Sequence, residues 1–134
     1  MADRYKILGQ DNLTPADGLT ELYSVPVAAA VTVGGAEVAP KVTSVLVQAL
    51  VTSIIVCNTD ATAGSFDIQL EAAAATSSDT YLFKVNSLSK NNTKVLSLGL
   101  TLSPGDKIRG NCTTGDCDFT VMGIEITSGG GPDV

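Results

Sequence analysis

Residues 92–127, NTKVLSLGLTLSPGDKIRGNCTTGDCDFTVMGIEIT, read as three β-strands joined by two turns. Leucine recurs at every second position from Leu96 to Leu102, the spacing at which side chains of a strand return to the same face. Residues 103–106 (SPGD) and 113–116 (TTGD) end the first two strands, because proline presets φ for a turn and glycine tolerates a positive φ. The stretch therefore predicts a compact all-β module in which each turn reverses the chain.

Further strands are indicated before this stretch. Residues 41–50 and 52–58 carry β-branched residues on both faces, which is typical of strands packed against another layer. Residues 65–71 alternate most clearly, which predicts a half-exposed strand with Asp67 and Gln69 on its outward side. The other candidates are strands at residues 20–25 and 81–85 and a loose hairpin within residues 27–39 about two glycines.

About eight strands with turn signals between them are typical of a single β-sandwich of jelly-roll type with antiparallel strands. We expect an extended N-terminal arm at residues 1–18, the sandwich at residues 19–127 and a flexible C-terminal tail at residues 128–134. The arm contains Tyr5, Ile7 and Leu8 followed by glycine, proline and other breakers. Its apolar part either adds an edge strand to its own sheet or pairs with a neighbouring subunit, and the sequence leaves both placements open.

Composition narrows the function classes. The chain has 134 residues, 44% of them hydrophobic, and a net charge of -6 with eight basic residues. Nucleic acid is an unsuitable partner for it, because phosphate binding needs clustered Lys and Arg. The longest apolar stretch falls short of the ~20 residues that span a bilayer, and the N-terminus does not resemble a secretory signal peptide. We expect no membrane association and synthesis in the cytoplasm of a host cell.

The chain is not expected to be an enzyme. It contains no histidine, which is the commonest general base and a common metal ligand. Carboxylate pairs for glycoside hydrolysis and an aspartate-rich calcium turn at residues 114–118 are the alternatives, but neither has supporting spacing. The acidic residues are best explained as a solvated face, so we expect no catalytic residue, no cofactor and no metal.

Three cysteines have separate interpretations. Cys112 and Cys117 flank the turn at residues 113–116, so they are expected to face one another across a hairpin, where a disulfide is geometrically plausible. Cytosolic synthesis would instead keep both thiols reduced until release from the cell. Cys57 is expected to be a small hydrophobic residue in a buried strand.

Several segments, in this order, resemble small virion structural proteins of tailed bacteriophages, particularly of cyanophages. The resemblance is carried by residues 22–26 (LYSVP), 51–70 (VTSIIVCNTDATAGSFDIQL), 81–83 (YLF), 98–110 (LGLTLSPGDKIRG) and 119–127 (FTVMGIEIT). Two departures stand out: an insertion between Pro26 and Val51, and a neutral segment, EAAAATSS, in place of an arginine-rich one. The resemblance carries over no catalytic residue.

The resemblance implies a capsid decoration or cement protein of the virion surface. Its expected partners are the major capsid protein and other copies of itself, commonly as a homo-trimer. The residues expected to contact partners lie in the arm and in the insertion: Arg4, Tyr5, Ile7, Leu8, Val31, Val33, Val38 and Val42. A tail, baseplate or fibre module is the alternative, and a non-viral carbohydrate-binding sandwich is more remote, because both classes favour exposed aromatics and this chain has few.

Overall fold

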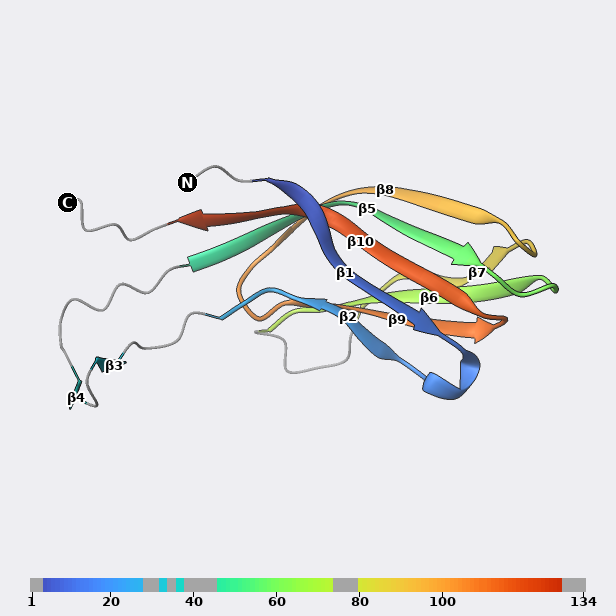
Figure 1. The fold of residues 1–134 in the computed structure, drawn as a ribbon, viewed down its shortest axis with the longest axis horizontal. Coiled ribbons are helices and arrows are strands. Elements are labelled where there is room, and N and C mark those ends of the chain that lie inside the picture. The colour runs from blue at the N-terminus through green and yellow to red at the C-terminus, as the bar shows by residue number, and fades with distance from the viewer. Residues whose placement is uncertain (1–3, 28–31, 34–35, 38–45, 74–79, 129–134) are drawn as a thin grey trace.

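The computed structural model describes residues 4–27, 32–33, 36–37, 46–73 and 80–128, and most of them lie in β-strands (Figure 1). The one helical piece within these ranges is a 3-10 turn, η1 (Pro15–Asp17). No described helix is long and apolar enough to cross a membrane. The strands are β1 (Tyr5–Leu13), β2 (Thr20–Ser24), β3 (Thr32–Val33), β4 (Ala36–Glu37), β5 (Leu46–Asn58), β6 (Gly64–Glu71), β7 (Thr80–Leu88), β8 (Thr93–Leu102), β9 (Lys107–Thr114) and β10 (Cys117–Ser128).

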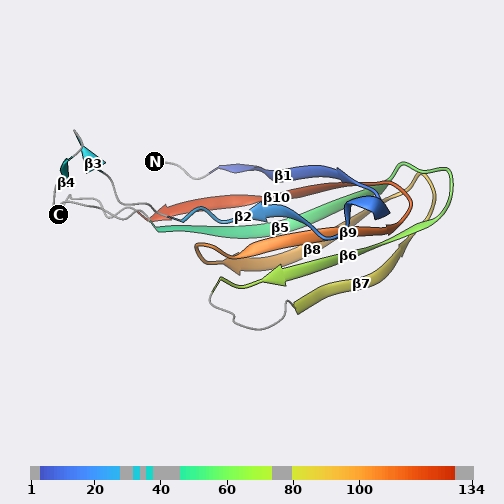
Figure 2. The same ribbon diagram turned by 90° about the horizontal axis from the view of Figure 1, so that it is seen from below.

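Eight of these strands form two four-stranded antiparallel sheets, which confirms the all-β sandwich. Sheet A has the order β1-β10-β5-β8 and sheet B the order β2-β9-β6-β7. The first strand of the eight pairs with the last, the second with the seventh, the third with the sixth and the fourth with the fifth. This pairing is that of a rolled-up hairpin, the jelly roll. Figure 2 shows β1 and β10 along one side of the domain and β6 and β7 along the other.

The core lies between the two sheets. Every second residue of the long strands points inward, and Phe66 of β6 meets Phe119 of β10 edge to face, with ring centroids 6.1 Å apart. The buried apolar residues are Leu13, Leu22, Tyr23, Val25, Ala49, Val51, Ile54, Val56, Phe66, Ile68, Leu88, Leu96, Leu102, Ile108, Cys112, Cys117, Phe119 and Val121.

The stretch at residues 92–127 forms three strands as predicted, but its turns are not hairpins. β8 and β10 belong to sheet A and β9 to sheet B, so the chain changes sheet at each turn. The first turn is closed by the backbone of Asp106, which donates to the Ser103 carbonyl at 3.0 Å, while the Asp106 carboxylate accepts from the Ser103 amide at 2.8 Å. The same turn chemistry serves a hairpin and a corner between sheets, which is why the sequence did not distinguish them.

Two strand predictions need correction. Residues 46–58 form the single strand β5, because the chain continues through a bulge at Thr52 instead of ending there. Asp67 and Gln69 do lie on the outward side of β6, yet only 4% and 7% of their surfaces are exposed, because β6 is an inner strand between β9 and β7. The outward side of the strand is therefore buried at Asp67 and Gln69, and it is partly exposed only near the ends, at Ser65 and Glu71.

The N-terminal segment takes the first of its two expected placements. β1 pairs with β10 from Tyr5 to Leu13 as an edge strand of sheet A. Close packing on β2 also fixes this strand, since a Cβ added at Gly9 would overlap the Leu22 carbonyl oxygen. The predicted hairpin within residues 27–39 is confirmed by the pairing of β3 with β4, and the tail beyond Ser128 lies outside the described residues.

Candidate partner-binding surfaces

The outer face of sheet A is assembled from residues that alternate with the buried core positions. Along the middle of β5 and β10 the inward residues are buried, from Ala49 to Val56 and from Cys117 to Val121, so the residues between them point away from the core. Cross-strand pairing places the outward residues in four rows over β1, β10, β5 and β8. The rows are Tyr5–Ile124–Leu50–Thr101, Ile7–Met122–Ser53–Ser97, Gln10–Thr120–Ile55–Val95 and Asn12–Asp118–Cys57–Thr93.

We call these four rows the apolar face. Eight of its sixteen positions are apolar, seven are uncharged and polar, and Asp118 at one end is the single charge. More than half of the surface of Tyr5, Ile7 and Val95 is exposed. Isolated exposed apolar residues are ordinary, but a contiguous set with almost no charge is typical of a surface that another molecule covers.

A hydrogen bond fixes the side chain of Tyr5 against the apolar face. Its hydroxyl forms a hydrogen bond with the Thr52 hydroxyl on β5, and the Thr52 hydroxyl donates to the Met122 carbonyl at 3.3 Å. Because β10 lies between β1 and β5, the ring of Tyr5 extends across β10 to make this contact. A rigid aromatic ring on an uncharged surface offers contact area at small entropic cost.

The predicted contact residues of the N-terminal segment divide between three environments. Tyr5 and Ile7 belong to the apolar face, Leu8 packs partly buried against the core, and Arg4 is exposed before β1. The other apolar members of the face were missed as contact residues: Leu50, Ile55, Cys57, Val95, Met122 and Ile124. The signal for them was the apolar character of both faces of residues 46–58, a pattern that is also typical of a strand covered by layers on both sides.

The residues predicted in the insertion are largely outside the structure. Val33 lies in β3, paired with Ala36. Val31, Val38 and Val42 lie outside the described residues.

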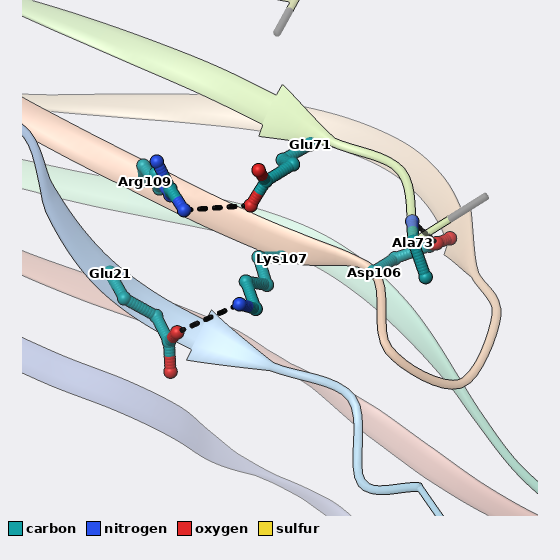
Figure 3. A network of polar contacts seen from close by, with 6 residues as sticks. All are labelled: Glu21, Glu71, Ala73, Asp106, Lys107 and Arg109. Atoms are coloured by element: carbon teal, nitrogen blue, oxygen red, sulfur yellow. Dashed lines mark hydrogen bonds and ion pairs between the residues drawn. The ribbon is translucent and has the colours of Figure 1, made fainter. Parts of the chain in front are cut away.

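The outer face of sheet B is charged, in contrast to the apolar face (Figure 3). Arg109 forms an ion pair with Glu71 at 2.8 Å, and Lys107 lies 3.9 Å from Glu21. Nearby, the Ala73 amide donates to the Asp106 carboxylate at 2.9 Å. Alternating charges of this kind keep a sheet face solvated.

A buried carboxylate shapes the edge of sheet B. β7 has a bulge here, because Lys84 and Val85 both lie opposite the single residue Asp67 of β6. Val85 has a φ of 47°. Its amide donates to Asp67 Oδ1 at 2.6 Å, and the Asn111 side chain donates to Oδ2 at 3.4 Å. A β-branched residue rarely adopts positive φ, so the Asp67 hydrogen bond holds a bulge that is locally unfavourable.

A polar bridge joins the two sheets beside β1. The hydroxyl of Tyr23, on β2, donates to Glu125 Oε2 of β10 at 2.6 Å in a partly buried bond, and Lys6 of β1 lies 2.7 Å from Oε1. Hydrogen bonds from Lys6 and Tyr23 hold the pKa of the Glu125 carboxyl below its usual range. Burial, followed by the bond to Glu125, raises the pKa of Tyr23, so the phenol remains a donor at neutral pH.

Cys112 and Cys117 face each other, but across the core between the two sheets and not across a hairpin. Their sulfur atoms are 2.6 Å apart, both residues are fully buried, and both are free thiols in the structure. Burial raises the pKa of each thiol. Since the thiolate is the reactive form, these two cysteines are protected from reagents in the folded protein. Cys57 is not in the core: it is partly exposed on the apolar face.

Aspartates gather at one end of β10. The Asn12 side chain donates to Asp116 at 2.6 Å and to Asp118 at 2.5 Å, beside a shallow surface depression of about 370 Å³. Among the described residues no three ligating side chains are placed to hold a metal ion. The cluster is accounted for by its hydrogen bonds with Asn12.

Comparison with known proteins identifies no family. No family model matches the chain, and no curated protein matches it. One solved structure, that of infectious bursal disease virus, Gt strain, is similar over 98% of this chain and 33% of its own, with 8% identity and a TM-score of 0.42. The chain thus spans about a third of the length of that chain, and a likeness at this level assigns no function.

Proposed function

We propose that this protein is a structural component of a bacteriophage virion, a decoration or cement protein on the outer surface of the capsid. Its partners are the major capsid protein and further copies of itself. The observation that carries the proposal is a jelly roll with one charged outer face and one long, nearly uncharged outer face. Jelly rolls are common in viral capsid proteins, and an uncovered apolar sheet face is expected of a subunit that works inside an assembly.

The mechanism is mass action. A protein that binds the assembled shell and not its separated subunits stabilises the shell by RT ln(1 + [L]/Kd), about 2.7 kcal/mol per site when free protein is at 100 times its Kd. The net charge of -6 directs such a protein away from the packaged nucleic acid. We assign the contact with the shell to the insertion, through Val31, Val33, Val38 and Val42.

The test is a comparison of purified particles with and without the protein. Particles that lack it are expected to lose infectivity faster on heating and on osmotic shock, and imaging is expected to show missing density on the head. Restoring the protein in trans should restore both properties.

Variants locate the contact. A chain in which the four insertion valines become serine should fail to restore heat resistance, whereas Val85→Ser, at an exposed valine of sheet B, should restore it. If particles without the protein keep heads of full resistance but fail to adsorb to the host, the protein is a tail or baseplate module and the proposal is wrong.

A further inference from the structure

We infer that the apolar face is a self-association surface, on which a second copy of this chain packs face to face about a twofold axis. The inference deepens the proposed function by naming the surface and the copy number of the self-contact, and its evidence is the surface of the isolated chain and not any particle. Three properties of the face lead to it: its area, its lack of charge and its hydroxyl groups.

The area is suitable for a dimer. The four strands of sheet A have 9 to 13 residues each. At about 3.3 Å per residue and about 4.8 Å between strands, ten residues on four strands cover roughly 600 Å² in projection. Side chains roughen this surface, so its accessible area approaches the ~800 Å² per partner of a standard interface. Two twisted sheets pack at about 10 Å separation with side chains interdigitated, as inside a sandwich.

The charge distribution favours the apolar face as the contact between two copies of this chain, which carry the same net charge. Two copies that each carry -6 repel one another unless the contact surface carries little charge. The outer face of sheet B meets this condition poorly, since Glu21, Glu71, Lys107 and Arg109 line it and their charges would have to give up water in the contact. The apolar face satisfies it, because its single charge, Asp118, stands in the last row.

The polar residues of the face are self-complementary. A twofold contact places each surface group against the same surface on the partner, so its polar groups need to both donate and accept. Ser53, Ser97, Thr101 and Thr120 carry hydroxyl groups, which do both. A lysine at these positions would face a copy of a surface whose single charge is Asp118, so most such charges would be buried unpaired. The face therefore accommodates a copy of itself without an unpaired charge.

The test is the mass of the purified full-length chain in solution. Sedimentation equilibrium or native mass spectrometry from about 1 to 100 μM, spanning micromolar affinity, should show a reversible monomer–dimer equilibrium. Val95→Lys, on the apolar face, should weaken the dimer more than about 100-fold, because each copy would bury an unpaired charge in the interface, which costs several kcal/mol. Val85→Lys is the matched control: valine 85 is 60% exposed and valine 95 is 59% exposed, but Val85 lies on sheet B.

Each outcome of this experiment either supports the dimer or overturns it. A folded chain that stays monomeric at the highest concentration overturns the inference, as does a dimer that Val95→Lys and Val85→Lys weaken equally. A trimer, which the phage resemblance implies, also overturns it, because a face-to-face contact closes at two copies. If Val95→Lys does not fold, Thr101→Lys at an exposed hydroxyl of the first row replaces it. None of these results bears on the particle experiment, so failure of this inference is distinct from failure of the proposed function.

Discussion

The bridge between the two sheets gives the sharpest stability prediction. Tyr23→Phe removes only the hydroxyl that donates to Glu125 at 2.6 Å, and leaves the ring in the core. A hydrogen bond to a charged group contributes about 1.5–3 kcal/mol. Glu125 keeps its ion pair with Lys6, and its side chain is 22% exposed, so water replaces part of the lost bond. We therefore expect a loss of about 1.5 kcal/mol in the free energy of unfolding at pH 7.

The assay is urea denaturation followed by circular dichroism, with m-values compared between variants. Tyr5→Phe is the matched control: it removes a tyrosine hydroxyl whose bond to Thr52 is solvent-exposed and uncharged, and should cost about 0.5 kcal/mol or less. Glu125→Gln and the double variant complete a cycle in which the coupling between Tyr23 and Glu125 should be about 1 kcal/mol. The measurement should be made below the dimerisation range, so that association does not enter the free energy.

The pH dependence of this stability difference follows from the Glu125 carboxyl. The pKa of Glu125 is lowered in the folded state, so its stabilising contribution is present above the unfolded value of about 4.3 and is lost as pH falls through the folded value. The difference between the wild type and Tyr23→Phe should therefore shrink below about pH 4. A Tyr23→Phe protein within about 0.5 kcal/mol of the wild type at pH 7, or a difference unchanged at acid pH, would refute the reasoning.

Three further predictions concern local packing. Gly123→Ala should lower the free energy of unfolding by at least about 2 kcal/mol, because the new Cβ would overlap the Leu50 carbonyl oxygen. The control, Gly99→Ala, has open space around it and should be neutral or stabilising. Thermal unfolding measures both, and equal melting temperatures for the two variants would contradict this prediction. Asp67→Ala should cost about 2 kcal/mol and speed hydrogen exchange at the Val85 amide, which loses its acceptor, and unchanged exchange would rule out the proposed support of the bulge. Iodoacetamide should modify Cys57 and no other cysteine in the folded, reduced protein and all three in urea, by mass spectrometry; rapid native modification of three thiols would show that the buried pair is accessible.

Local signals in the sequence predicted the strands well. The leucine alternation at residues 96–102 gave the position and the inward face of β8, and the two glycines within residues 27–39 gave the hairpin between β3 and β4. These features depend on neighbouring residues along the chain, so a single sequence contains them. The same holds for the all-β class and for the strand spacing that led to the jelly roll.

The assignment of strands to sheets depends on distant contacts and was not predictable in this way. A turn such as residues 113–116 connects two strands whether they pair with each other or separate into opposite sheets. Cys112 and Cys117 therefore meet as predicted, but through the core and not along a ladder. The burial of Asp67 has the same origin, because its hydrogen-bond partners are Val85 and Asn111, which lie 18 and 44 residues away along the sequence.

β5 is apolar on its outward side as well as on its inward side. An outward side chain of β5 gains nothing from the core of its own subunit, yet Leu50 and Ile55 are apolar on that side. On the outward side of sheet B, at the equivalent inner strands β6 and β9, the pairs are Glu71 with Lys107 and Gln69 with Arg109. Both sheets bury one face in the same core, so folding of one subunit does not account for the difference between their other faces. Exposed apolar surface lowers solubility and becomes favourable only when a partner removes it from water. We therefore expect the contrast between the two outer faces to reflect an assembly, and the outer face of sheet A is where its contact should first be sought.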